Sequence, residues 1–211
     1  MTYQLFYADR SAAQGVRMIL EELNQQYELI ETDIKSEEPR SPELLAANPN
    51  GLVPVLTFDG GMIYECGAIV TFLCDRHPEY RLAPKTGDLH RGLFLQWLFY
   101  FSSSLQNAFS MTYRPNRFST LKSSYSNVRQ QGNKRLLTLW QVVDNAIGES
   151  SWMLGESFSA VDIYLFMLST WLSDEYGHPD LTVFTNASRV ADQVRKRPSV
   201  ARVYPALHGA N

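Results

Sequence analysis

Residues 48–69 contain the residue types and spacing that most clearly indicate a binding or catalytic site. Val53-Pro54 interrupts an apolar run, and because proline has no N–H to give to a sheet ladder, this pair does something other than extend a central strand. Eleven residues after Pro54, Glu65-Cys66 opens a new helix, whose free N–H groups and positive dipole end attract carboxylates. A broken strand edge beside a helix N-terminus predicts a receptor for a small anionic peptide. The alternative is an ordinary strand, hairpin and helix.

The elements that must position these residues follow from the hydrophobic spacing of the first 77 residues. Short strands are expected at 3–7, 27–30, 53–58 and 62–64, and helices at 12–23, from Ser41-Pro42 onwards, and at 68–74. Asp59-Gly60-Gly61 indicates a hairpin between the last two strands. The order βαβ-α-ββα is that of the thioredoxin fold, with Pro54 at the position of its cis-proline.

A second, all-helical region is expected after a linker at 81–88 that contains Pro84 and Gly87. Apolar residues at helical spacing predict helices at 89–109, 121–147, 159–172 and 183–196, the last ending before Pro198. The predicted architecture is therefore α+β followed by all-α: a thioredoxin-like domain at 1–80 and a helical bundle at 89–211.

A capping box opens the third of these helices. Ser159 stands at its N-cap and Asp162 three residues later, and Phe158 and Ile163 are placed as a hydrophobic staple. We interpret this motif as structural, so Asp162 is expected to be buried and not catalytic.

The whole pattern resembles the cytosolic-type glutathione S-transferases, in a bacterial or theta/delta-like serine form, over nearly the full chain. The resemblance implies that Val53-Pro54 is cis and that the Val53 main chain pairs with the cysteinyl unit of glutathione. Glu65 would pair with the γ-glutamyl ammonium. Cys66 stands where the family usually has Ser or Thr, and its backbone N–H would meet the adjoining carboxylate, since a thiol is a weak donor.

The remaining contacts are less defined. Arg40 or Asn50 would reach the glycine carboxylate of glutathione. Cys66 is either a passive small residue or, as a thiol at a helix start, sensitive to oxidation. Cys74 lies in an apolar segment and is expected in the core.

Activation of glutathione requires a hydrogen-bond donor near a helix start, because a free thiol of pKa ~8.5 is mostly protonated at pH 7. Ser11 lies at the start of the first helix, like the serine of the theta and delta classes; Tyr7 ends the first strand, like the tyrosine of the alpha, mu and pi classes. We favour Ser11. The alternatives are that Ser11 is a plain N-cap and that Tyr7 is an aromatic residue of the core or of the pocket wall. Residues 8–15 contain no cysteine, which argues against a mixed-disulfide reductase.

The electrophile pocket is expected between the 7–11 loop and the first helix of the helical domain. Its candidate residues are Tyr100, Ser104, Phe109, Tyr113 and Arg114, with 111–119 as a loop that shapes it. Aromatic residues there fit a core as well as a pocket, so the electrophile stays unnamed.

Composition narrows the class of protein. A hydrophobic content of 45% and a net charge of −3 over 211 residues fit a soluble globular protein with no general attraction to nucleic acid. Two cysteines cannot form a disulfide framework. No signal peptide or long apolar run is evident, so the cytoplasm is expected, without membrane attachment.

The resemblance implies a transferase with glutathione as co-substrate, no metal, and a small hydrophobic electrophile or a peroxide as second substrate, as in detoxification. A non-catalytic binding or regulatory module and a glutathione-dependent isomerase or dehalogenase are the alternatives.

A homodimer is expected, in which the N-terminal domain of one subunit faces the helical domain of the other, as in the family. Residues 1–80 carry 13 acidic and 5 basic residues, a net −8, whereas residues 81–211 carry 9 acidic and 14 basic residues, a net +5. The opposite net charges of the two facing domains favour this pairing. The alternative is that the two halves attract each other only within one chain. Sedimentation at micromolar concentration and moderate salt tests it, and a single species near 24 kDa would refute the dimer.

Overall fold

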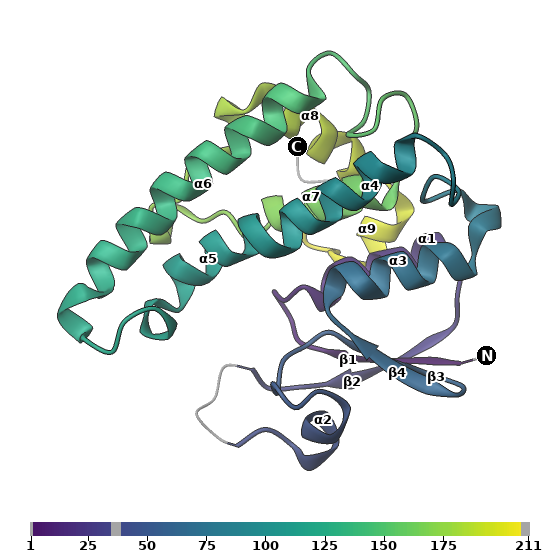
Figure 1. Ribbon diagram of the computed structural model, residues 1–211, viewed down its shortest axis with the longest axis horizontal. Helices are drawn as coiled ribbons and strands as arrows, with labels where there is room; N and C mark the ends of the chain where they lie inside the picture. Colours follow the sequence, from purple (N-terminus) through teal and green to yellow (C-terminus); the bar gives the residue numbers. More distant parts are fainter. Residues whose placement is uncertain (1, 35–38, 208–211) are drawn as a thin grey trace. The chain divides into compact units, whose positions relative to one another are not determined.

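The chain folds into two compact units. The computed structural model describes residues 2–34 and 39–207. The first unit runs to Lys85 and includes the chain again from Lys196, while the second comprises Thr86–Arg195 (Figure 1).

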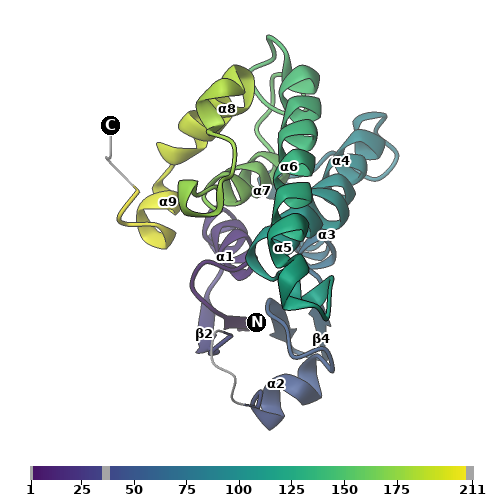
Figure 2. The ribbon, with the colours of Figure 1, turned by 90° about the vertical axis from the view of Figure 1, so that its left-hand side faces the viewer.

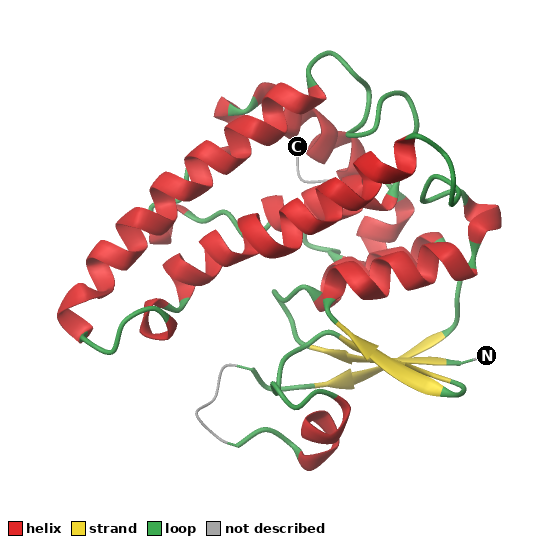
Figure 3. Cartoon of the chain, in the orientation of Figure 1, coloured by secondary structure: helices red, strands yellow, loops and turns green. Residues whose placement is uncertain are grey.

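A mixed four-stranded sheet forms the centre of the first unit. Its strands lie in the order β2-β1-β3-β4, with β1 parallel to β2 and antiparallel to β3, and β3 antiparallel to β4. Helices α1 and α3 cover one face and α2 the other (Figures 1 and 3). This is the predicted thioredoxin-like fold, with β1 at Tyr3–Tyr7, α1 at Ala13–Glu22, β2 at Tyr27–Glu31, α2 at Pro42–Ala47, β3 at Val55–Phe58, β4 at Gly61–Tyr64, α3 at Cys66–Arg76 and a 3₁₀ turn at Pro78–Tyr80.

Alternation along β1 divides the core of this unit in two. Tyr3 and Leu5 are fully buried on one face of the sheet. Phe6 points to the other face, where it packs with Leu44 and Ala47 of α2 and with Val55. The second, smaller core therefore lies next to the chain that leads into Pro54.

The last helix differs from the sequence-based division. Residues after 196 were expected in the helical domain, but Pro198 begins α9 (Pro198–Val203), which packs on α1 in the first unit. Arg197 donates two hydrogen bonds to Glu22, at 2.8 and 2.7 Å, and the Ser199 hydroxyl donates a third at 2.6 Å. Proline is well suited to the first turn of a helix, which is why the chain restarts a helix where a stop was expected.

The second unit is helical, as predicted, and its first helix is longer than expected. Residues 90–113 form one continuous helix in which α4, a π-helical segment and α5 follow without a break, and α5 packs beside α6 (Figure 2). The loop expected at 111–119 therefore starts only after Tyr113. The helices are α4 (His90–Phe99), the π segment (Tyr100–Leu105), α5 (Gln106–Tyr113), α6 (Tyr125–Ile147), α7 (Ala160–Ser169) and α8 (Thr185–Arg195), with 3₁₀ turns at Pro115–Arg117, Lys122–Ser124, Asp174–Tyr176 and Leu181–Val183.

The predicted capping box begins α7, whose residues are almost entirely buried. The Asp162 carboxylate accepts the N–H of Ser159 at 2.8 Å and the N–H of Met153 at 2.8 Å. Burial raises the pKa of Asp162 to about 6, although these hydrogen bonds act to lower it. Asp162 thus anchors the helical core.

Within the ranges that the structure describes, no helix is both long and apolar enough to cross a membrane.

Glu22→Gln is expected to destabilise the first unit by about 1–2 kcal/mol at pH 7, because Arg197 then loses its charged partner. Burial alone would raise the pKa of Glu22, but the hydrogen bonds from Arg197 and Ser199 outweigh it and lower the pKa. The stabilisation is therefore complete above the ordinary glutamate pKa of 4.5 and is lost as the pH falls through the lower folded-state value.

Urea unfolding at pH 7 and between pH 5 and 3 measures this effect, with Glu31→Gln at an exposed position as the control. Equal acid sensitivity of the wild type and Glu22→Gln would contradict it.

Candidate functional site

The turn before Pro54 is built by Asn48, to which the sequence analysis gave no role. Asn48 is 3% exposed; its amide Nδ2 donates to the Leu52 carbonyl at 2.8 Å and its Oδ1 accepts the Asn50 N–H at 3.1 Å. Gly51 follows with φ +61°, a conformation that favours glycine. The Val53–Pro54 peptide bond is cis, as the resemblance implies.

Val53 presents an available main chain. Its side chain packs against the small core around Phe6 and Val55, which fixes its position. Ladder pairing of β3 begins only at Val55, and no described residue hydrogen-bonds to the N–H or C=O of Val53. An unpaired N–H and C=O in a segment held in place by its side chain can pair with a peptide as an added strand does.

Glu65 has an unusual backbone at the start of α3. Its φ of 74° is rare for a residue with a long side chain, and the residue is exposed. No described side chain caps the start of α3 at Glu65, and the N-terminus of a helix favours an anion. The Cys66 thiol is buried and lies 3.5 Å from the Ala12 carbonyl, where it joins the starts of α3 and α1.

The two candidates for the glycine carboxylate differ. Arg40 donates to the carbonyls of Asp33 at 2.6 Å and Ile34 at 3.1 Å, so its guanidinium holds the chain after β2. Its stem also lies over Gly51, where an added Cβ would come within 2.9 Å of Arg40 Cγ. Asn50 is exposed at the tip of the turn.

Ser11 stands two residues before the first residue of α1 and is only 6% exposed. Its hydroxyl donates to the Ala8 carbonyl at 2.6 Å and accepts the Ala13 N–H at 3.2 Å. These two bonds hold the turn from β1 into α1. Its role as a thiolate donor stays a prediction, and it would require the O–H to turn away from Ala8.

Tyr7 is half-buried at the end of β1, where the Arg17 guanidinium carbon lies 5.8 Å from its ring centroid. Arg17 also donates to the Tyr27 hydroxyl at 3.1 Å and to the Arg202 carbonyl at 3.3 Å. The aromatic ring of Tyr7 therefore belongs to a network that joins α1, β2 and α9.

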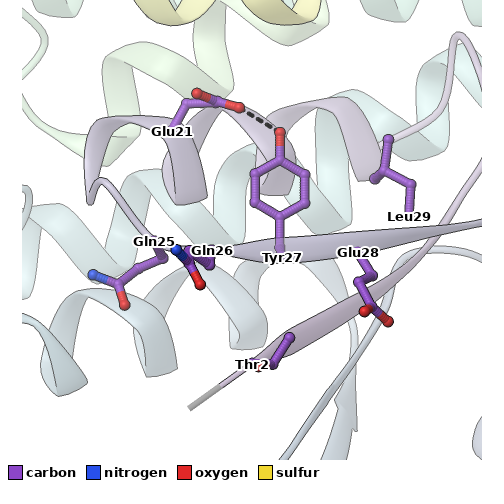
Figure 4. A pocket seen from close by; sticks show the side chains of 7 residues that line it. All are labelled: Thr2, Glu21, Gln25, Gln26, Tyr27, Glu28 and Leu29. Carbon is purple, nitrogen blue, oxygen red and sulfur yellow. Dashed lines mark hydrogen bonds between the residues drawn. The ribbon is translucent and has the colours of Figure 1, made fainter.

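A shallow concavity lies elsewhere on the first unit, at the end of α1 and the start of β2 (Figure 4). Glu21 in it accepts hydrogen bonds from Tyr27 and Arg202, and Glu28 accepts one from Gln4 at 3.0 Å. Because these carboxylates already have partners in the chain, we assign no ligand to this concavity, which is lined by Thr2, Glu21, Gln25, Gln26, Tyr27, Glu28 and Leu29.

Comparison with known proteins agrees with this geometry. Residues 5–81 match the family model "Glutathione S-transferase, N-terminal domain". The chain is 29% identical over 170 residues to the glutathione S-transferase GstA of Escherichia coli O157:H7, covering 80% of this chain and 81% of the relative. It is 30% identical to BphK, a bacterial glutathione transferase, with a TM-score of 0.81 and coverage of 97% and 98%.

The chain belongs to the glutathione transferase family.

A glutathione transferase homologue from Sulfitobacter, solved with bound glutathione, also shares 25% identity with a TM-score of 0.88, over 98% of this chain and 99% of that one.

The five residues predicted for the electrophile pocket all lie in the helical unit. Tyr100 and Ser104 are half-buried in the π segment, and the Tyr100 hydroxyl donates to the Leu139 carbonyl at 3.3 Å. Burial raises the pKa of Tyr100 above its ordinary value. Tyr113 and Arg114 are half-buried at the end of α5.

Phe109 is a core residue, with 1% of its surface exposed. It packs edge-on against His178, at a centroid distance of 5.3 Å, and beside Tyr113, at 6.2 Å. Burial lowers the pKa of His178 to about 4, so this ring is neutral and its Nε2 bonds with Thr112 Oγ1 at 2.8 Å. For Phe109, the core alternative considered above therefore fits the structure better than the pocket.

Glu65→Gly and Glu65→Ala form a matched pair that separates backbone strain from binding. Both remove the carboxylate and are expected to weaken glutathione binding alike. Only glycine adopts a φ of 74° without backbone strain. The free energy of unfolding of Glu65→Gly should therefore be about 1 kcal/mol higher than that of Glu65→Ala. Calorimetric titration and urea unfolding measure the two effects, and equal stability of the two variants would contradict the strain argument.

Proposed function

We propose that this chain binds glutathione and activates its thiol as a thiolate, for attack on a small hydrophobic electrophile or reduction of a peroxide. The unpaired N–H and C=O of Val53, held beside the cis Pro54, carry this proposal. They fit the main chain of the cysteinyl unit, and a backbone pair of this kind is a recurrent way of binding an extended peptide.

The two ends of glutathione would be held by different chemistry. The carboxylate of the exposed residue Glu65 would pair with the γ-glutamyl ammonium, and the Cys66 N–H at the α3 N-terminus with its carboxylate. Arg40 or Asn50 would meet the glycine carboxylate. For Arg40 this contact has to compete with the carbonyls that its guanidinium already binds.

Thiolate stabilisation is assigned to Ser11, with Tyr7 as the second candidate. A donor at a helix start adds its own hydrogen bond to the favourable dipole of α1. The 2.6 Å bond from Ser11 to Ala8 would be exchanged for a bond to the glutathione sulfur, which as an anion is the stronger acceptor.

Cytoplasmic location and a homodimer complete the proposal. Large apolar side chains are exposed on α4 and at the residue before it, with Leu89 at 94%, Leu93 at 45% and Phe99 at 67% exposed. An apolar stripe of this kind on a solvent-facing helix supports an interface with a second copy.

Retention on immobilised glutathione, followed by a conjugation assay, separates this function from the alternatives. Retention without conjugation would favour a binding module, and retention with turnover of a substrate that leaves glutathione unconsumed would favour an isomerase. Failure to bind glutathione at all would refute the proposal.

Ser11→Ala is expected to destabilise the bound thiolate by about 1.5–3 kcal/mol, because one hydrogen-bond donor to a charged group is removed. This corresponds to a roughly ten- to hundredfold shift of the thiol–thiolate equilibrium toward the thiol. Tyr7→Phe should leave the thiolate in place. Thiolate absorbance of the glutathione complex and the pH dependence of conjugation measure both variants. If Tyr7→Phe loses the thiolate and Ser11→Ala keeps it, the assignment is wrong.

A further inference from the structure

Asn50 stands before a glycine, and no other asparagine of the sequence does. An asparagine loses its side-chain amide when the backbone nitrogen of the next residue attacks its Cγ, and a glycine, which has no side chain, hinders this attack least. Asn50 is exposed, and its side chain makes no hydrogen bond to any residue that the structure describes. The Asn50-Gly51 pair therefore has a chemistry of its own, which the function proposed above does not use.

The turn around this pair holds the attacking nitrogen in place. The Gly51 N–H donates to the Asn48 carbonyl at 2.8 Å. Gly51 is buried although Asn50 is exposed, and the stem of Arg40 lies over it. Loss of the Gly51 proton and attack on Asn50 Cγ both require this hydrogen bond to open. The two reacting groups are thus adjacent in the chain but do not meet while the turn is closed.

The buried Asn48 side chain keeps the turn closed. Its Nδ2 donates to the Leu52 carbonyl at 2.8 Å, and its Oδ1 accepts the Asn50 N–H at 3.1 Å. Asn48 cannot undergo the same reaction, because the nitrogen of Pro49 carries no proton. Since a local opening is governed by the few hydrogen bonds that it breaks, Asn48 determines how often Gly51 can react.

We propose that Asn50 is a site of spontaneous deamidation and that the turn built by Asn48 sets the rate. In the open turn, hydroxide takes the proton from the Gly51 nitrogen, which then forms a bond to Asn50 Cγ. The Cγ–Nδ2 bond breaks, and ammonia leaves with a proton taken from water. Water then opens the resulting succinimide ring. Cleavage between Cγ and the Gly51 nitrogen gives aspartate, cleavage between the backbone carbonyl carbon and that nitrogen gives isoaspartate, and neither product requires an oxidant or a reductant.

Either product places a new negative charge in the turn that leads to Val53. Asn50 is one of the two candidates for the glycine carboxylate of glutathione, so a carboxylate at this position would repel that group. The deamidated protein is expected to bind glutathione more weakly, and the difference should shrink at high salt. This consequence rests on the proposed function, whereas the deamidation itself does not.

Peptide mapping by mass spectrometry, after incubation of the whole protein at mildly alkaline pH, measures deamidation at each asparagine. A synthetic peptide of residues 46–56 gives the rate without the folded turn. Asn50 should react faster than every other asparagine of the folded protein, but more slowly than in the peptide. Asn50→Gln should abolish the reaction at this position, because glutamine would have to form a larger ring.

Two variants of Asn48 test the control by the turn. Asn48→Ala removes both side-chain hydrogen bonds and should speed deamidation of Asn50 roughly tenfold. Asn48→Ser keeps an acceptor for the Asn50 N–H, so it should give a smaller increase, and it replaces Asn48→Ala if circular dichroism shows that the latter is unfolded. Asn133→Ala is the matched control, since it removes a 2.9 Å hydrogen bond to the Tyr176 carbonyl in the second unit and should leave the rate at Asn50 within twofold.

The contrary outcomes are distinct. If Asn50 in the folded protein reacts no faster than the other asparagines while the peptide reacts, Asn50 is not a deamidation site of this protein. If the folded Asn48 variants leave the rate unchanged, or Asn133→Ala raises it equally, the turn does not control the reaction.

Calorimetric titration with glutathione tests the consequence for binding. Asn50→Asp should weaken binding about two- to fivefold at low salt. Asn24→Asp makes the same charge change at an exposed position after α1 and should not weaken it. Equal binding by Asn50→Asp and the wild type would overturn the predicted effect of deamidation. If the wild type binds no glutathione, the proposed function fails, while the mass spectra still decide the deamidation.

Discussion

The structure of the first unit depends on one constraint, that the chain at Val53-Pro54 cannot continue the sheet. Proline lacks the N–H that a neighbouring strand would accept, so regular pairing of β3 starts at Val55 and the main chain of Val53 is left unpaired. The turn before it is fixed by the buried Asn48 amide, and the small core around Phe6 holds the Val53 side chain. A rigid but unpaired backbone segment is what an extended peptide ligand needs.

The helical unit places its polar groups by different means. Its core is built around the buried helix α7, anchored at its start by Asp162 and contacting the long helix 90–113 through Tyr164 and Gln106. The π segment in that long helix sets the faces that its side chains share. Polar groups here are held by hydrogen bonds from buried phenols and hydroxyls, whereas in the first unit the backbone itself offers the contacts.

Much of the fold could be predicted, because local signals and tertiary packing agree. Period-two and period-3.6 spacing gave the thioredoxin-like order and the helical region, and Ser159 with Asp162 gave the start of α7. The path of α9 could not be predicted, since it depends on pairs such as Arg197 with Glu22 that are 175 residues apart. The same limit applies to the candidate site. Val53, Pro54 and Glu65 belong to one short sequence motif and could be predicted. The burial of Phe109 and the hydrogen bond between Gln106 and Tyr164 depend on contacts between distant segments and could not. No local pattern reports that the Ser11 hydroxyl already donates to Ala8.

A structure of this protein with glutathione bound tests the central claim most directly. The account predicts that the cysteinyl unit pairs with the N–H and C=O of Val53, with the γ-glutamyl end at Glu65 and at the Cys66 N–H. Glutathione bound elsewhere, with the Val53 main chain still unpaired, would contradict it.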